Sequence, residues 1–223
     1  MLSEVFHVEK ALDICYKIWY FFVINVLFLI SNLPILLVVL FVGMDQLRTC
    51  LPLVFLTLTA LCPALSAVFY AMNRLLAGTE RGAWKDYWKG YKNGFWQKLR
   101  LGFVHMFILL ICWTNVEFFT LQIPFLPLAI LFFLLFAAAV LVTPECYLFA
   151  SRYEMTNLQL ARLAVVVSAA RPFITLGNTA AFALMLAAFE VSAGTTVLFM
   201  GSVYGFLVAF MNRKILESLE HQE

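Results

Sequence analysis

The sequence predicts an all-α membrane protein, a polytopic bundle of six transmembrane helices with two amphipathic helices on its cytoplasmic surface. Hydrophobic residues make up 64% of the 223 residues and charged residues only 13%, whereas a soluble domain is typically about half apolar and a quarter charged. The apolar residues form long runs, each close to the roughly 17 to 25 residues with which a helix crosses a bilayer. Basic residues cluster between these runs. The whole chain, residues 1–223, is expected to form a single membrane domain.

Six apolar runs are expected to cross the membrane, and two more polar stretches to lie on its surface. The spans cover about residues 19–42, 51–76, 99–119, 125–147, 172–189 and 195–211, and the surface helices about residues 81–97 and 154–170. The first run is too long for the core of a signal peptide and no cleavage pattern follows it, so we interpret it as a retained span.

Polar residues and a proline interrupt the first run. Residues 5–17 mix apolar and charged side chains and predict a short amphipathic lead-in. Within the span, Asn25 and Asn32 carry amides that neighbouring helices must satisfy, and Pro34 removes a backbone donor. We therefore expect a kink between Ser31 and Pro34.

The basic residues predict the orientation. With six spans, fourteen of the fifteen Lys and Arg residues fall on one side, and only Arg48 falls on the other. Cytoplasmic loops carry such an excess of positive charge. An inverted or five-span arrangement would place the cluster from Arg81 to Arg100, or Arg213 and Lys214, outside. The expected location is the cell membrane, with several passes and both termini in the cytoplasm.

The segment from Arg81 to Gly102 is the longest polar stretch. On helical spacing its aromatic side chains form one stripe and its lysines a neighbouring stripe. The candidate residues for partner docking or membrane-surface contact are Trp84, Lys85, Trp88, Lys89, Tyr91, Lys92, Phe95 and Trp96. One interpretation is a helix that anchors two spans at the headgroup level, where aromatic rings and lysine side chains settle. The other is a docking surface for a partner, with Gly90 and Gly94 allowing close backbone approach. Because Gly in a helix costs about 1 kcal/mol relative to Ala, we expect a break near Gly90.

No motif for hydrolysis, nucleotide binding or dinucleotide binding is present. The five cysteines and three histidines lack metal-ligand spacing, so we expect no metal, no cofactor and no catalytic activity. A net charge of +2 gives no reason to expect nucleic acid as a partner. His105 is expected to form an interhelical hydrogen bond.

Several ionisable or polar residues fall in the apolar runs or at their ends. Glu117, Glu145 and Glu190 are interpreted as solvated caps at span ends. The one ion pair that we considered joins Glu145 to Arg74 or Arg152. The candidate intramembrane polar contacts are Asn25, Asn32, Pro34, Arg74, Glu145 and Arg152.

Four stretches carry a family resemblance. In chain order they read IWYFFVINVLFLISNLPILL, CPALSAVFYAMNRLLAG, WKDYWKGYKNGFWQKLRLG and CYLFASRYEMTNLQLARLA. Together they resemble the YesL-like family of bacterial membrane proteins, a domain of unknown function. The matching positions are Asn32, Pro34, Pro63, Leu75, Gly78, Trp88, Lys92, Asn93, Phe95, Gly102, Arg152 and Tyr153. The segment ARLAVVVSAA departs from the family pattern, which is more polar there.

The resemblance implies a role in sugar uptake, because such proteins are commonly encoded beside carbohydrate ABC importers and glycan-degrading enzymes. We therefore expect an accessory or scaffolding subunit of a carbohydrate ABC importer. Its partners would be the lipid bilayer and the permease or ATPase subunits, and pairing with a second copy of the chain is left open. Neither an EAA-type permease loop nor a nucleotide-binding motif is present, which argues against a core subunit.

The alternative function is a small carrier for a small polar solute. Carriers use broken helices and bundle-facing polar groups. The residues that would line such a path are Asn25, Asn32, Asn73, Asn115 and Asn178.

Overall fold

The computed structural model describes residues 2–43, 46 and 49–220, and all regular structure in these residues is helical. The helices are α1 (Leu2–Ser31), α2 (Leu33–Val42), α3 (Leu51–Leu58), α4 (Leu61–Leu76), α5 (Ala83–Lys92), α6 (Phe95–Glu117), the π-helical segment η2 (Phe118–Gln122), α7 (Leu126–Arg152), α8 (Asn157–Ala170), α9 (Pro172–Val191), α10 (Ala193–Val197) and α11 (Met200–Glu220). Arg48, the predicted outer cation, lies outside the described residues.

Among the residues that the structure describes, five helical stretches are long and apolar enough to cross a membrane. They are Glu9–Ser31, Leu51–Leu76, Phe95–Gln122, Leu126–Arg152 and Pro172–Val191. These stretches correspond to the first five predicted spans.

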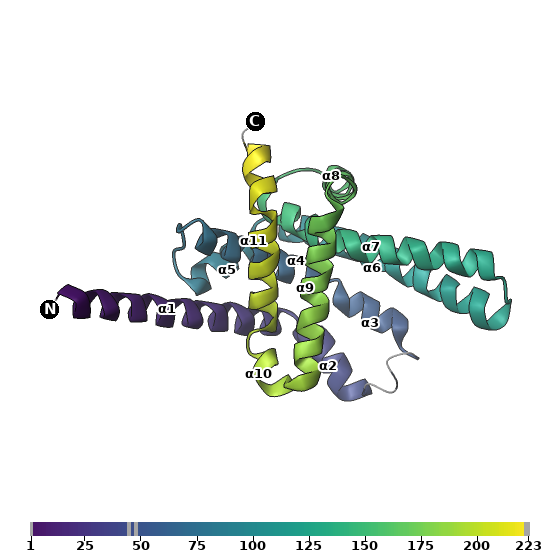
Figure 1. Ribbon diagram of the computed structural model, residues 1–223. Coiled ribbons are helices and arrows are strands. Elements are labelled where there is room, and N and C mark those ends of the chain that lie inside the picture. The colour runs from purple at the N-terminus through teal and green to yellow at the C-terminus, as the bar shows by residue number, and fades with distance from the viewer. Residues whose placement is uncertain (1, 44–45, 47–48, 221–223) are drawn as a thin grey trace.

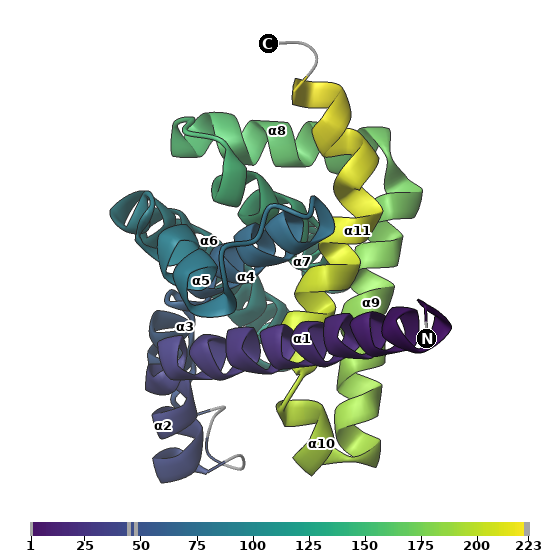
Figure 2. The same ribbon diagram turned by 90° about the vertical axis from the view of Figure 1, so that its left-hand side faces the viewer.

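The helices surround α4, which packs against α1, α5, α6, α7 and α11. In Figure 1, α6 and α7 form a long hairpin that projects to the right, while α9 and α11 run side by side and are joined through α10. Figure 2 shows α8 running crosswise to α9 and joining its upper end, on the side of the bundle where α11 ends. The N-terminal half of α1 projects from the bundle, and residues 9–19 are all exposed.

Three glycines let neighbouring helices approach α4 closely. A Cβ at Gly90 of α5 would lie 2.8 Å from Cβ of Tyr70, and one at Gly102 of α6 would lie 2.7 Å from the carbonyl oxygen of Thr59. Gly205 of α11 faces Val68 in the same way. Small residues at helix contacts are typical of membrane bundles, where van der Waals packing replaces the hydrophobic driving force.

Two predicted spans are each divided into two helices. α1 ends at Ser31 and α2 begins at Leu33 with Pro34 in its first turn, so the predicted kink is confirmed. The second predicted span, residues 51–76, consists of α3 and α4, which are separated by Thr59 and Ala60. Pro63 explains this break, because it lacks an N–H and its ring excludes the carbonyl group four residues earlier, that of Thr59.

The sixth predicted span, residues 195–211, is not one helix. α10 ends at Val197 and α11 begins at Met200. Asn25 of α1 satisfies the backbone at the break, since its Nδ2 donates to the carbonyl oxygen of Val197 (2.6 Å) and its Oδ1 accepts from the N–H of Gly201 (2.8 Å). The apolar part of α11 before Asn212 is roughly 18 Å long at 1.5 Å per residue, shorter than the roughly 30 Å hydrocarbon core.

Other boundaries also differ from the prediction. Residues 5–17, expected as a separate lead-in, continue directly into α1. The second surface helix begins at Asn157 instead of residue 154. Thr156 and Gln159 form a capping box there: Oε1 of Gln159 accepts from the N–H of Thr156 (3.0 Å), and Oγ1 of Thr156 accepts from the N–H of Gln159 (3.4 Å). This T-x-x-Q pattern is a recognised start signal for a helix.

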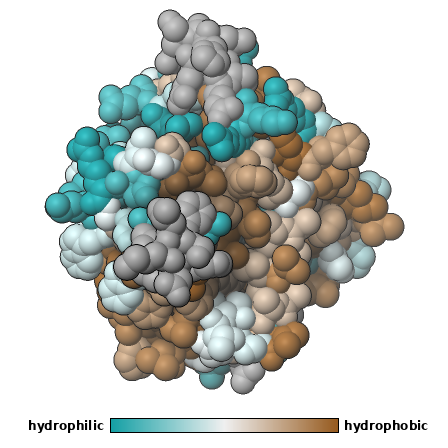
Figure 3. Space-filling model, turned by 60° about the vertical axis from the view of Figure 1, so that its left-hand side comes forward, coloured by the Kyte–Doolittle hydropathy of each residue, from teal (hydrophilic) through white to brown (hydrophobic). Residues whose placement is uncertain are grey.

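The surface is divided into a polar and an apolar region. In Figure 3 hydrophilic residues gather at the top and upper left of the visible face, and hydrophobic residues cover its lower and right-hand parts. Large apolar side chains such as Phe41 and Phe173 are more than 80% exposed. An exposed apolar surface of this extent is typical of contact with a membrane or with another protein.

Candidate functional site

The segment from Arg81 to Gly102 forms two helices instead of one. α5 ends at Lys92, and Gly94 adopts a left-handed conformation (φ 61°) before α6 begins at Phe95. Lys98 of α6 closes this turn by donating to the carbonyl oxygen of Gly90 (2.7 Å) at the C-terminal end of α5. The surface helix expected over residues 81–97 is divided, as the predicted break near Gly90 implies, but the break lies at Gly94, one turn beyond Gly90.

The predicted surface residues lie on the outer side of this turn. Trp84 and Trp96 are 61% and 70% exposed. The three lysines of α5 are exposed as well, whereas Trp88, Tyr91 and Phe95 are half-buried. We call the exposed set the α5 surface; it consists of Trp84, Lys85, Lys89, Lys92 and Trp96.

An unbroken series of aromatic contacts runs under the α5 surface. The ring centroids are 6.0 Å apart for Trp84 and Trp88, 5.4 Å for Trp88 and Tyr91, 5.2 Å for Tyr91 and Phe95, and 5.6 Å for Phe95 and Trp96. Burial raises the pKa of Tyr91, so its phenol stays neutral. These contacts hold the exposed tryptophans in place across the break between α5 and α6.

A groove runs beside the α5 surface, between α1 and the start of α5. Its volume is about 560 Å³, and Trp19 and Trp84 line it together with the cationic residues Arg81 and Lys85. Trp19 and further apolar side chains of α1 form one wall, and Arg81, Trp84 and Lys85 belong to the other. An occupant would therefore meet Trp84 and positively charged groups on one side and an apolar helix with Trp19 on the other.

The inner face of α5 is fixed by Asp86, which is 1% exposed. Its Oδ2 accepts from the hydroxyl of Tyr20 on α1 (3.1 Å) and from the backbone N–H of Arg81 (2.9 Å). Its Oδ1 lies 3.3 Å from Nε of Arg74 on α4. One carboxylate thus joins α1, α4 and α5.

Arg74 has a different partner from the one predicted. Besides the ion pair with Asp86, its Nε donates to the carbonyl oxygen of Thr79 (3.0 Å) and its guanidinium to the hydroxyl of Tyr70 (3.3 Å). The considered pairing with Glu145 is wrong, because Glu145 lies on α7 and bonds to Asn178. Asp86 was not predicted as a site residue, although it is the single carboxylate between Arg81 and Gly102.

Gly90 and Tyr87 complete the inner face. Gly90 is buried against Tyr70 of α4, so its lack of a side chain serves packing within the bundle and not approach of a partner. Tyr87 is fully buried and donates to the hydroxyl of Ser31 at the end of α1 (2.8 Å). Burial also raises the pKa of this phenol. These contacts hold α5 firmly against α1 and α4, so its outer face has a fixed position.

This part of the chain carries the similarity to a known family. Residues 21–116 match the family described as protein of unknown function, DUF624. The match runs from α1 to the end of α6 and includes Asp86, Arg74 and the α5 surface. Comparison with curated proteins and with solved structures gives no match.

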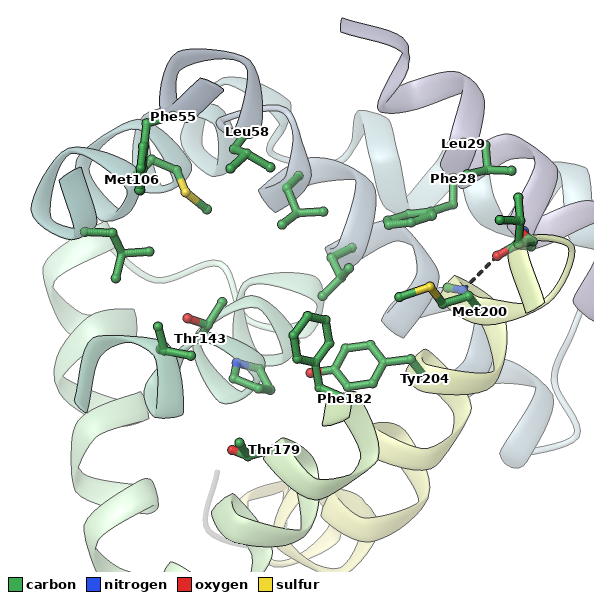
Figure 4. Close-up of a pocket in the computed structure, with 18 residues that line it drawn as sticks. Phe28, Leu29, Phe55, Leu58, Met106, Thr143, Thr179, Phe182, Met200 and Tyr204 are labelled. Carbon is green, nitrogen blue, oxygen red and sulfur yellow. Dashed lines mark hydrogen bonds between the residues drawn. The ribbon is translucent and has the colours of Figure 1, made fainter. Parts of the chain in front are cut away.

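A second hollow lies inside the bundle. Figure 4 shows an apolar cavity of about 410 Å³ between α1, α3, α4, α6, α7, α9 and the start of α11. Phe182 and Tyr204 lie side by side in its wall, with their ring centroids 5.7 Å apart. Its few polar side chains are those of Asn25, Thr143, Thr179 and Tyr204. The volume falls within the roughly 300 to 1,000 Å³ of small-molecule sites.

Glu145 lies deep in the bundle. It is 1% exposed and accepts a hydrogen bond from Nδ2 of Asn178 (2.9 Å). Its interpretation as a solvated cap is therefore wrong, whereas Glu190 is exposed and Glu117 half-buried. Glu145 is about 10 Å along α7 from Arg152 at 1.5 Å per residue, and Arg152 is exposed at the end of that helix.

The remaining predicted polar residues do not converge on one path. Asn32 bonds to the carbonyl oxygen of Phe28 (2.8 Å), and Asn115 to that of Ile111 (2.8 Å), each within or next to its own helix. Pro34 is exposed. Of the five asparagines assigned to a carrier, Asn25 lines the cavity and Asn178 contacts Glu145. His105 meets Thr143 of α7 (3.0 Å) in the interhelical contact expected for it.

Proposed function

We propose that this protein is an accessory or scaffolding subunit of a carbohydrate ABC importer in the cell membrane, without catalytic activity of its own. The observation that carries the proposal is the α5 surface, where two largely exposed tryptophans stand beside three lysines. Aromatic residues are enriched at the centres of protein interfaces and supply much of their binding energy.

The attachment of α5 supports docking. Because Asp86, Tyr87 and Gly90 fix its inner face to α1 and α4, the outer side chains are preorganised. A preorganised surface loses little conformational entropy on binding. The partner would be a permease or ATPase subunit that presents acidic and apolar groups.

The proposed orientation places α5, α8 and both termini in the cytoplasm. The lysines of α5, together with Arg152, Arg162, Arg213 and Lys214, then lie on the side where positive charge is retained. The proposal includes membership of the YesL-like family. The match over residues 21–116 to a family of unknown function and the resemblance at Arg152 and Tyr153 support it. The importer as partner rests on that resemblance.

Removal of the α5 surface should abolish co-purification. The test is a mild-detergent pull-down of the tagged full chain from its native host, in the unaltered form and with Trp84→Ala and Lys89→Ala combined. Since truncation of an interface hot spot weakens binding by about 2 kcal/mol or more, we expect the importer subunit to be reduced at least tenfold. Trp84 and Lys89 are exposed, so folding should be retained.

The matched control is the pair Arg171→Ala and Phe173→Ala, which also removes one cation and one exposed aromatic ring. This variant should co-purify like the unaltered protein. If no permease or ATPase co-elutes with any form, the accessory function is wrong and the α5 surface serves as a membrane anchor.

A small carrier is the second candidate. The observation that favours it is the cavity in the bundle, which lies next to the buried Glu145 through Pro144. If proteoliposomes that contain this protein alone take up a labelled solute, the protein is a carrier and the accessory function is wrong. Equal uptake with and without the protein, across a panel of sugars and amino acids, would exclude the carrier.

A further inference from the structure

Three helices meet at a buried series of polar side chains that lies outside the matched region. Nδ2 of Asn212 on α11 donates to Oδ1 of Asn178 on α9 (3.2 Å) and to the carbonyl oxygen of Val208 (2.9 Å). Nδ2 of Asn178 donates to Oε1 of Glu145 on α7 (2.9 Å). Glu145 is 1% exposed and both asparagines 0%. We call these three residues the Glu145 cluster.

The two side-chain hydrogen bonds between members of the Glu145 cluster run from Asn212 through Asn178 toward the carboxyl group. Two oxygen atoms nevertheless have no hydrogen-bond partner, Oε2 of Glu145 and Oδ1 of Asn212. No ion pair to Glu145 exists within the described part of the chain. Burying a carboxylate without a counter-charge is costly, and a buried polar atom without a partner adds to that cost.

As a bare carboxylate, Glu145 has neither a counter-charge nor a hydrogen-bond partner for Oε2. A proton on Oε2 or a cation beside it would neutralise the buried charge. We propose that the Glu145 cluster binds a small monovalent cation, a proton or a sodium ion, at the junction of α7, α9 and α11. Oε2 of Glu145 would take the proton, or would coordinate the sodium ion together with Oδ1 of Asn212, because both oxygen atoms lack a hydrogen-bond partner.

The donor set favours a hard monovalent ion. Carboxylate and amide oxygens suit sodium and other hard cations, whereas transition metals prefer nitrogen and sulfur ligands. Within the described residues no three His, Cys, Asp or Glu side chains are grouped for a metal. One carboxylate neutralises one positive charge, so a divalent ion would leave net charge in an apolar bundle.

Glu145 is the strongest acid in and around the cluster, because the neighbouring titratable groups are a thiol and a phenol. The titratable residues around it are Cys146, next to it on α7, and Tyr204 of α11. Thr175, one turn before Asn178 on α9, also approaches the carboxyl group. A polar or ionisable residue inside a membrane bundle commonly marks an ion or proton path. Pro144 and Tyr204 also line the cavity of Figure 4. A cation bound at the Glu145 cluster would therefore affect which molecules the cavity can bind.

The inference does not rest on the accessory function, because the Glu145 cluster lies on other helices than the α5 surface. If the protein is a carrier, the cation bound at the Glu145 cluster would be its coupling ion. Loss of importer co-purification and loss of cation binding are separate results, so one proposal can fail while the other stands.

The test is the thermal unfolding midpoint of the purified full chain in detergent. Sodium is titrated against choline at constant ionic strength, and pH is varied in a second series without sodium. If sodium is the ligand, the midpoint of the unaltered protein should rise by about 5 °C or more at roughly 100-fold excess over the dissociation constant. Because sodium competes with the proton for the carboxylate, the midpoint of this rise should shift to higher sodium concentrations at lower pH.

Glu145→Gln should remove this response, since it deletes the negative charge and keeps the size of the side chain. Asn212→Ala keeps the carboxyl group and should weaken sodium binding about tenfold. Glu190→Gln, at an exposed glutamate, is the matched control and should respond like the unaltered protein. Equilibrium binding of radioactive sodium to the unaltered protein gives a direct measure if a variant fails to fold.

If the proton is the ligand, sodium should have no effect. The midpoint of the unaltered protein should then fall as pH rises and the buried carboxyl group loses its proton, and it should fall less in Glu145→Gln. The proposal is overturned if no radioactive sodium binds and if the midpoints of the unaltered protein and Glu145→Gln depend identically on pH.

Discussion

Replacing Asp86 by Ala is expected to lower the unfolding midpoint in detergent by roughly 10 °C. The substitution removes the ion pair with Arg74 and the acceptor for Tyr20 and for the Arg81 N–H, all on a residue that is 1% exposed. Breaking a buried ion pair costs about 3–5 kcal/mol, and each kcal/mol shifts the midpoint of a chain this long by about 2–4 °C. The midpoint can be followed by tryptophan fluorescence or by size-exclusion chromatography after heating.

The same substitution should release α5. Trypsin should cut faster at Lys85, Lys89 and Lys92 in the variant, because cleavage requires local opening of the helix. Asp86→Asn keeps a side-chain oxygen for Tyr20 and Arg81. Its cleavage rate should therefore lie between those of the unaltered protein and Asp86→Ala. Asp13→Ala is the matched control, since Asp13 pairs with Lys17 at 2.7 Å but both side chains are more than half exposed. Exposed pairs contribute only about 0–1 kcal/mol, so an equal effect of Asp13→Ala and Asp86→Ala would contradict this account.

The helical class of the fold could be predicted because it depends on local patterns. Apolar runs of sufficient length gave five stretches that match the predicted spans, and Pro34 marked the break between α1 and α2. The sixth span could not be divided correctly from local pattern. The backbone at the end of α10 and the start of α11 is satisfied by Asn25, which is more than 170 residues earlier in the chain.

The candidate site was predictable on its outer side only. Helical spacing placed aromatic and basic residues of α5 on adjacent stripes, and the structure leaves Trp84, Lys85 and Lys89 exposed. Asp86 was not predicted as a site residue because a charged residue in a polar stretch is normally solvated. Its side-chain partners belong to α1 and α4, which lie outside that stretch. Glu145 was assigned to a span end because the fourth predicted span ends at residue 147. That position in the sequence does not reveal that α9 and α11 cover the carboxyl group.

Gly102→Val is expected to have the other large effect on stability. A Cβ there would lie 2.7 Å from the carbonyl oxygen of Thr59 and 2.8 Å from Cβ of Cys62. These atoms belong to the backbone break between α3 and α4 and to a fully buried residue, so neither can move away without displacing a helix. Overpacking a tight core typically costs about 1–3 kcal/mol and occasionally more. With contact to backbone we expect the upper end, and a decrease of the unfolding midpoint in detergent by roughly 10 °C.

Gly194→Val separates this steric effect from the change of residue type. Gly194 lies in α10 with no atom within 4 Å of an added Cβ, so the valine there should change the midpoint by less than about 2 °C, as expected for a surface substitution within about 0.5 kcal/mol. Gly102→Ala should fall between the two valine variants, because it adds the clashing Cβ without the two methyl groups. If Gly102→Val were as stable as Gly194→Val, α6 would not approach the break between α3 and α4 as closely as described.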